Sequence, residues 1–432
     1  MAELSPASTH ASTRLREALL PLELAPRERL RTPTLSRWNA LRGVRVGLTV
    51  AVLLLLLIGA NLATPLYPAL QTRLGLNPVD TTLLFTVYVF ALVPVLAAVG
   101  HWSDQLGRRA LVLPAVVMAA CGDAVFASAN SLGQLAAGRA VQGIAVGLAT
   151  SAAGAALADL LPDRPTLAAK LTLAASAGGV ALGPLLGAAL AQGADPIVTP
   201  FTLHAVALLA LCIPLAVLHP RTPGHHTAPL RVPGRLSLRP RALSLPQQGR
   251  GIFLLAAGTG FVSYAVFGVY LSLAPSYAAS LLHTHAPIAG AGVAALLLGS
   301  SAAAQLLARP TRSRSVPVLG MSGLALGLGL VVLAGYAHLP ALLFLGSVLG
   351  GASQGLAFRA LFARAVAAME PERRASELSA LWVVVYLGSS LPIVAVGFLA
   401  RAYGILPAVT VFAAVAATAC VGLAVASARS RH

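Results

Sequence analysis

The chain has 432 residues, of which 57% are hydrophobic and only 10% are charged, and its formal net charge is +17. Soluble domains contain roughly 45–50% apolar and about 25% charged residues, so a water-soluble fold could not hide this much apolar surface, and a polytopic membrane protein is predicted. The basic residues lie between apolar runs without interleaved aromatic residues, which argues against a nucleic-acid partner.

Residues 1–45 form a basic tail that precedes any sustained apolar run. A cleaved signal peptide would have its apolar core after a short basic start, so none is expected here. We interpret the tail as cytosolic and largely disordered, with helical turns around residues 13–24 lying on the anionic inner leaflet.

Twelve apolar runs that follow the tail are long enough to cross a bilayer core of roughly 30 Å. They are predicted at 46–70, 81–100, 110–128, 131–157, 171–192, 201–218, 251–280, 288–307, 316–337, 341–364, 378–400 and 408–426. Residues 219–250 are rich in Arg and Pro and contain no acidic residue, which predicts an irregular cytosolic linker. The prediction is an all-α integral membrane protein with two six-helix halves, at 46–218 and 251–426, and a short tail at 427–432.

The distribution of basic residues gives the predicted orientation. If the first span runs outward, nearly all basic residues fall on the cytosolic side, while Arg73 and Arg401 lie outside and Arg139 lies within the membrane. Both termini are then expected in the cytosol. The preference for Arg over Lys, with abundant Ala, Leu and Gly, indicates a GC-rich bacterial genome, so we expect the bacterial cytoplasmic (inner) membrane. We also expect the protein to be a monomer.

Neither a metal site nor a catalytic residue is expected. The cysteines Cys121, Cys212 and Cys420 all lie inside apolar runs, which argues against disulfides and against a cysteine zinc site. His283 and His285 share an outer loop without further ligands. A membrane enzyme would need clustered acids or ligands in the spans, and the chain has no nucleotide-binding loop of the Gly-x-x-x-x-Gly-Lys kind.

A short charged hinge joins the second and third runs. Its pattern, Gly-x-x-x-Asp-x-x-Gly-Arg-Arg, is made by Gly100, Asp104, Gly107, Arg108 and Arg109. A charged interfacial turn would explain the two arginines but not the placed glycines and aspartate. The hinge resembles the signature loop of the major facilitator superfamily, although Trp102 replaces a small aliphatic residue and Gln105 a basic one. The resemblance implies the major facilitator fold, in which twelve helices form two pseudo-symmetric halves.

The hinge is expected to stabilise one state of a gate. We predict that Asp104 lies near the cytosolic start of span eleven, where exposed N–H groups carry partial positive charge. Arg108 or Arg109 is predicted to reach Asp159, after span four.

A weak internal repeat agrees with the two halves. Residues Val141-Gln142-Gly143 in span four recur as Ser353-Gln354-Gly355 in span ten, and Gly183-Pro184 in span five recurs near Leu391-Pro392 in span eleven. Such matches arise easily in Gly- and Leu-rich chains, so only the agreement with the span count gives them weight.

Two spans carry motifs that resemble those of the family's twelve-span drug:proton antiporters. In span one the motif is Gly59, Pro65 and Pro68, and because proline cannot donate to the helix ladder, the outer end should bend. The alternative is an ordinary proline-capped helix end. In span five the motif is Gly179, Gly183, Pro184 and Gly187, whose glycines recur every fourth residue and form a face that permits close helix packing.

Two opposite charges fall at a similar depth in the membrane. Asp123 lies in span three and Arg139 in span four, beside Gln142 and Gly143, in an element that resembles the family's Arg-x-x-x-Gly pattern. An isolated charge there costs on the order of 3 kcal/mol, so we predict that the two side chains pair and respond to protons. The alternative is a static structural salt bridge. Family antiporters often have an acid in span one, and this chain has none.

Seven polar and aromatic residues are candidates for lining a central cavity, since the resemblance places spans one, four, seven and ten around it. They are Asn61, Tyr88, Gln142, Tyr264, Tyr270, Gln354 and Tyr386. The resulting prediction is a secondary transporter that exports hydrophobic or amphipathic small molecules across the lipid bilayer, without a cofactor and with the proton as coupling ion. An uptake symporter or facilitator, or a non-transporting sensor of the same fold, is the alternative.

Overall fold

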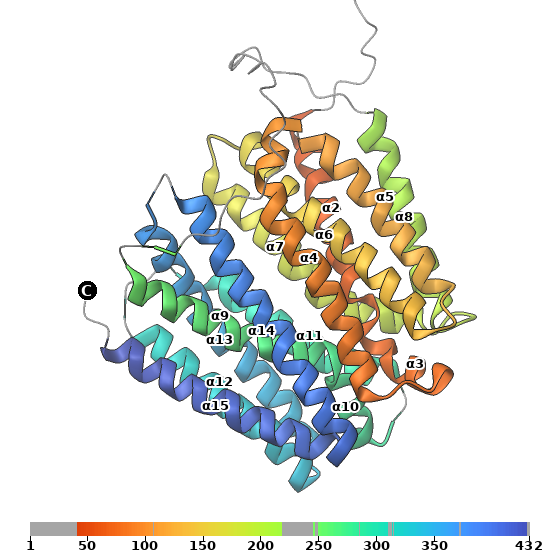
Figure 1. The fold of residues 1–432 in the computed structure, drawn as a ribbon, viewed down its shortest axis with the longest axis vertical. Coiled ribbons are helices and arrows are strands. Elements are labelled where there is room, and N and C mark those ends of the chain that lie inside the picture. The colour runs from red at the N-terminus through yellow and green to blue at the C-terminus, as the bar shows by residue number, and fades with distance from the viewer. Residues whose placement is uncertain are drawn as a thin grey trace, which may run out of the picture.

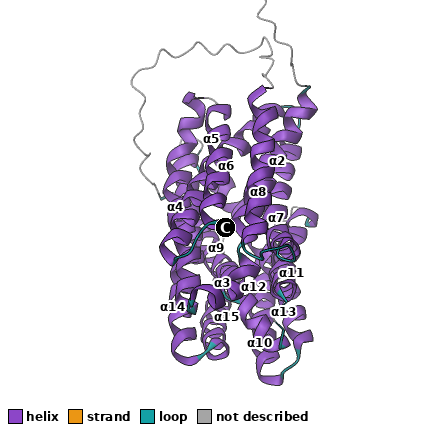
Figure 2. Ribbon diagram, turned by 90° about the vertical axis from the view of Figure 1, so that its right-hand side faces the viewer, coloured by secondary structure: helices purple, strands orange, loops and turns teal. Residues whose placement is uncertain are grey.

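The computed structural model describes residues 41–106, 108–217, 245–246, 249–284, 286–309, 313, 315–370 and 373–429. Within these residues the chain is helical (Figures 1 and 2). The helices are α2 (Arg42–Leu62), η1 (Thr64–Leu66), α3 (Tyr67–Leu74), α4 (Pro78–Leu106), α5 (Arg108–Ala127), α6 (Leu132–Leu160), α7 (Pro165–Leu190), α8 (Val198–Val217), α9 (Arg250–Ser272), α10 (Ala274–Leu282), α11 (Pro287–Leu307), α12 (Ser315–Ala337), α13 (Pro340–Ala368), α14 (Arg374–Tyr403) and α15 (Ile405–Arg429).

Twelve segments of the described chain are helical, long and apolar enough to cross a membrane, which confirms the predicted number of spans. They form two bundles, α2–α8 and α9–α15, which are coloured red to green and green to blue in Figure 1. Within the bundles α2 packs on α7 and α9 packs on α14, and between them α4 packs on α14 and α7 on α11. The predicted tail at 1–45 and linker at 219–250 lie almost wholly outside the described residues.

The two bundles repeat one packing scheme. A Cβ atom added to Gly143 on α6 would collide with the backbone of Tyr88 on α4, and one added to Gly355 on α13 would lie 2.5 Å from the carbonyl oxygen of Ser301 on α11. Both glycines therefore permit the fourth helix of a bundle to touch the second. The short repeat in the sequence thus corresponds to equivalent contacts in the two halves.

The first helix of each half is broken near one end. Helix α2 ends at Leu62, and Pro65, which cannot donate a backbone hydrogen bond, lies in the 3₁₀ turn η1 before α3. The predicted bend is therefore present. The predicted continuous span 251–280 is divided at Leu273 into α9 and α10, and Pro275 lies in the first turn of α10.

The two ends of the bundle can be named by their elements. We call one the α6–α7 end, after the turn at residues 161–164, and it is predicted to be cytosolic. The opposite end is the α3–α10 end, where α3 contacts α10 (Figure 1). There Arg73 pairs with Asp195 at 3.2 Å, and backbone N–H groups of Val198 and Ile197, together with Arg73, lower the pKa of the Asp195 carboxyl group.

Candidate functional site

A cavity of about 1260 Å³ lies between the two halves. Its walls come from α2, α4, α6 and α7 of the first half and from α9, α11, α13 and α14 of the second. This volume exceeds the roughly 300–1,000 Å³ of common ligand pockets, so an organic molecule can enter it with water.

Among the residues that the structure describes, the cavity lining reaches one end of the bundle and not the other. At the α6–α7 end its lining includes Pro162, Thr166 and Ala363, which are exposed. At the α3–α10 end α3 contacts α10 and η1 contacts α11. A Cβ atom added to Gly397 on α14 would lie 3.3 Å from the carbonyl oxygen of Pro78 at the start of α4, so the halves touch there. The cavity is open on the side that is predicted to be cytosolic.

Five of the seven predicted cavity residues line this space: Asn61, Tyr88, Tyr264, Gln354 and Tyr386. The predictions for Gln142 and Tyr270 are wrong. The amide of Gln142 is buried between α5 and α6, where it bonds to Asp123 and Arg139 instead.

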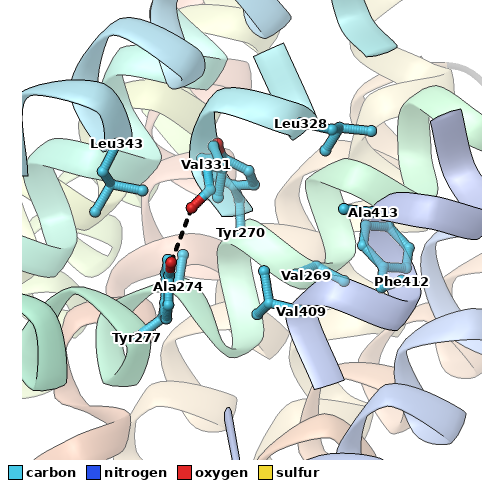
Figure 3. Close-up of a pocket in the computed structure, with 10 residues that line it drawn as sticks. All are labelled: Val269, Tyr270, Ala274, Tyr277, Leu328, Val331, Leu343, Val409, Phe412 and Ala413. Carbon is cyan, nitrogen blue, oxygen red and sulfur yellow. Dashed lines mark hydrogen bonds between the residues drawn. The ribbon is translucent and has the colours of Figure 1, made fainter. Parts of the chain in front are cut away.

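Tyr270 borders a separate cavity of about 20 Å³ inside the second half (Figure 3). Its hydroxyl group lies 3.0 Å from the hydroxyl oxygen of Ser347, and nearby the hydroxyl of Tyr277 donates to the carbonyl oxygen of Val331 at 2.8 Å. This space holds about one water molecule, so no organic substrate fits.

An aromatic cluster forms one wall of the large cavity. It consists of Tyr264 and Phe267 from α9, Phe358 and Phe362 from α13, and Trp382 and Tyr386 from α14. The Trp382 ring centre lies 5.5 Å from that of Phe362 and 5.8 Å from that of Tyr386, and Tyr264 lies 5.5 Å from Tyr386. Of these six residues only Tyr264 and Tyr386 were predicted. The i, i+4 spacing of Phe358 with Phe362 and of Trp382 with Tyr386 was the available signal.

A buried polar network lies beside the cavity in the first half. Asp123 on α5 bonds through Oδ2 to Nδ1 of His204 on α8 at 2.6 Å and accepts from Nε2 of Gln142 at 2.7 Å. Gln142 in turn accepts at 3.1 Å from Nη1 of Arg139, which is 1% exposed. The predicted direct pair of Asp123 with Arg139 is therefore wrong, because Gln142 stands between them.

Arg139 is turned toward the broken first helix instead. Its Nη1 donates to the carbonyl oxygen of Ala60 at 2.8 Å and its Nη2 to the hydroxyl of Tyr67 at 3.0 Å. The guanidinium carbon lies 5.3 Å from the ring centre of Tyr88, a cavity residue. The network therefore touches the cavity wall through Tyr88 and through α2.

The hydrogen bonds of His204 determine how many protons it shares with Asp123. Its Nε2 lies 2.9 Å from the carbonyl oxygen of Leu55, which can only accept, so Nε2 carries a proton. The 2.6 Å contact between Nδ1 and Asp123 needs a second proton, on either atom. With these two protons the pair is electrically neutral overall.

His204 was not predicted as a site residue. It is the one histidine within the twelve predicted spans, which was the available signal. A Cβ atom added to Gly59 on α2 would collide with the imidazole ring, so the glycine of the first-span motif provides the space that His204 occupies.

The glycine face of α7 packs against the backbone of α2. Cβ atoms added to Gly179 and Gly183 would lie 2.7 Å from the carbonyl oxygens of Leu54 and Ile58, and one added to Gly187 would collide with that of Leu62. The close approach predicted for this face is present. Helix α2 carries both the cavity residue Asn61 and the carbonyl groups that accept hydrogen bonds from the polar network. Close packing against α7 therefore fixes the position of the helix that is shared by the cavity and the network.

The charged hinge is described only in part. Nε of Arg108 donates to Oδ2 of Asp159 at 3.0 Å, which agrees with the predicted contact. Gly107 and the side chains of Asp104 and Arg109 lie outside the described residues, as do Gly100 beyond its backbone and His285 of the outer loop. Glu377, in the first turn of α14, is fully buried and was not predicted.

Comparison with known proteins places these features in a family. The family model for the Major Facilitator Superfamily matches residues 49–392. A bacterial homolog of the human lysosomal transporter Spinster, solved in inward-facing unoccupied and occupied conformations, has a TM-score of 0.69 and 15% identity over 90% of this chain and 95% of that one. The human organic anion transporter MFSD10 (TETRAN) has a TM-score of 0.61 and 19% identity over 89% of this chain and 100% of that one.

One curated relative, the bacillibactin exporter of Bacillus subtilis (strain 168), is 30% identical over 99 residues. These residues are 22% of this chain, and the match spans only 25% of that relative's length. The family model, in contrast, runs from α2 through the network, the cavity and the glycine face to α14. The chain therefore belongs to the Major Facilitator Superfamily.

Proposed function

We propose that this protein is a secondary transporter that exports hydrophobic or amphipathic small molecules by alternating access, in exchange for protons. The observation that carries the proposal is the cavity between the halves, which reaches the α6–α7 end while contacts between α3 and α10 close the other end. A site that opens to one side at a time is what alternating access requires. With the α6–α7 end in the cytosol of a bacterial cell, this is the inward-open state.

The Asp123–His204 pair is the proposed proton site, and it replaces a direct pair of Asp123 with Arg139. In the inward-open state the pair holds a releasable proton. Loss of that proton leaves a carboxylate, which the positive charge of Arg139 stabilises through Gln142. Both protonation states are therefore supported, and each places a different charge beside α2 and Tyr88.

The available energy suffices for export. A proton crossing roughly 100 mV contributes about 2.3 kcal/mol, and one pH unit contributes about 1.4 kcal/mol. Together they sustain a roughly 400-fold gradient of a neutral substrate. Export rather than uptake is favoured by the antiporter-like motif on α7 and by the exporter named among the relatives. An uptake symporter would instead move substrate in the same direction as the proton.

Alternating access predicts opposite movements at the two ends. We would replace the three native cysteines and introduce pairs of new cysteines that carry spin labels. One pair, at Thr166 and Ala363, spans the cavity mouth, and the other, at Thr72 and Ser280, spans α3 and α10. In lipid nanodiscs, electron–electron distance measurements should show a second population in which the Thr166–Ala363 distance is shorter and the Thr72–Ser280 distance is longer. Acidic and alkaline buffer should change the balance of the two populations. One unchanging distance at each end under all conditions would contradict the proposal.

A further inference from the structure

The described cavity lining carries positive charge and no negative charge. Its two charged residues are Lys170 on α7 and Arg359 on α13. Lys170 is the single lysine of the chain, and its exposed ammonium group makes no ion pair with a described residue. Nη1 of Arg359 donates to the carbonyl oxygen of Gln305. A cationic ligand would therefore find no counter-charge in this lining, whereas an anionic ligand would find two.

The two positive charges belong to different halves and lie toward the open end. Lys170 follows the start of α7 at Pro165 by five residues, or about 7 Å. Arg359 precedes the end of α13 at Ala368 by nine residues, or about 14 Å. An acidic group bound between them would contact both halves of the protein.

The aromatic cluster lies next to Arg359 and extends deeper. Phe358 precedes Arg359 in α13, and Trp382 and Tyr386 follow the start of α14 by about 12 and 18 Å. Tyr264 follows the start of α9 by about 21 Å. Trp382 is thus at about the depth of Arg359, and Tyr386 and Tyr264 lie deeper. A ligand with its acidic group at the depth of Arg359 would place an attached ring system against the cluster.

Aromatic walls also attract cations, so the ring geometry matters. Tyr264 meets Trp382 and Tyr386 at interplanar angles of 70° and 78°, with edges turned to faces. Parts of the ring faces are therefore covered by the edges of neighbouring rings and are not free to contact a cation. No carboxylate lies beside these rings in the described lining. Gln354 adds a buried amide Nε2 donor without an acceptor among the described residues. The surplus of positive charge and donors favours an acceptor-rich anion.

We propose that the cavity binds aromatic organic anions, with the ring system against the aromatic cluster and the acidic group held by Lys170 and Arg359. The proposal rests on the proposed function for the role of the cavity as substrate site. Binding can nevertheless be measured without any transport.

The test compares three probes on the purified full-length protein in nanodiscs. They are 2-naphthalenesulfonate, the 2-naphthyltrimethylammonium cation and the saturated decahydronaphthalene-2-sulfonate. The quenching of tryptophan fluorescence and isothermal titration calorimetry should show the aromatic anion binding at least about five-fold more tightly than either other probe, since single charge or ring contacts give roughly 1 kcal/mol. Equal or tighter binding of the cation would overturn the proposal.

Variants locate the two parts of the site. Lys170→Gln and Arg359→Gln should each weaken binding of the aromatic anion about five-fold without weakening binding of the cation, while Lys170→Arg should retain the affinity for the anion. Trp382→Leu should remove the preference for the aromatic over the saturated anion. Arg73→Gln, an exposed change outside the cavity, is the matched control and should change nothing. Identical affinities in the wild type and both Gln variants would overturn the assignment of the charged groups.

Transport in proteoliposomes separates this proposal from the proposed function. Selective binding of the aromatic anion without movement across the bilayer would support the substrate class and contradict the transporter. Movement of the cation but not of the anion would support the transporter and contradict the substrate class.

Discussion

Asp123→Asn is expected to abolish pH-driven accumulation while ligand binding and membrane insertion persist. The asparagine oxygen can still accept from Gln142, and its amide can donate to Nδ1 of His204 while Nε2 donates to the carbonyl oxygen of Leu55. The hydrogen bonds of the network are thus retained, but the releasable proton is lost. Under a gradient of one pH unit, the accumulation ratio should fall from a ceiling of roughly ten-fold toward one.

The measurement is uptake into inside-out vesicles under an imposed pH gradient, with ligand binding to the purified protein measured in parallel. Asp163→Asn is the matched control, because this carboxylate is 79% exposed and pairs only with Arg42 among the described residues. It should accumulate substrate as the wild type does. If Asp123→Asn moves substrate against its gradient with an unchanged pH dependence, the buried pair is structural and coupling lies elsewhere.

Gly183→Leu is expected to abolish transport or to make the protein leak protons. A Cβ atom alone at this position would lie 2.7 Å from the carbonyl oxygen of Ile58 and 2.8 Å from Cβ of Asn61, so the rest of a leucine must push α7 away from α2. Overpacking of this kind costs about 1–3 kcal/mol or more. The displaced helix α2 carries both cavity and network contacts, so substrate flux and proton flux should change together.

Gly178 offers a control on the same helix, because a Cβ atom there would have ordinary contacts at 3.7 Å from Cδ1 of Leu54. Gly178→Ala should transport normally, whereas Gly183→Ala should already show a deficit. Both are read from substrate flux and from the decay of an imposed pH gradient. Normal flux without a leak in Gly183→Leu would mean that close packing at this face is not required.

The number of spans and the break in the first helix could be predicted because they depend on local chemistry. Apolar runs longer than about 17 residues have few alternatives to a membrane helix, and Pro65 removes a backbone donor whatever surrounds it. The division of α9 from α10 was missed because the run 251–280 is apolar throughout, and Pro275 near its end reads equally well as part of one long span.

The polar network shows where prediction from sequence stops. Counting residues along a helix gives the depth of a side chain but not the neighbour it faces, so Asp123 and Arg139 were paired on depth alone. In the structure Arg139 donates a hydrogen bond to the carbonyl oxygen of Ala60 in the broken first helix, and His204 rather than Arg139 contacts Asp123. The aromatic cluster was found only in part for the same reason, since its six rings come from three helices that meet only in the folded bundle.

The most direct test of proton-coupled exchange is proton movement driven by substrate alone. Purified protein would be reconstituted into proteoliposomes with a pH-sensitive dye inside, and whichever naphthalene probe binds would be added outside without an imposed pH gradient. Neither probe carries a titratable proton across the bilayer, so any pH change reports the protein. We expect inward probe flux to drive protons outward and make the lumen alkaline with the wild type, and to leave the lumen unchanged with Asp123→Asn. Probe flux through the wild type without any change of lumenal pH would contradict proton exchange.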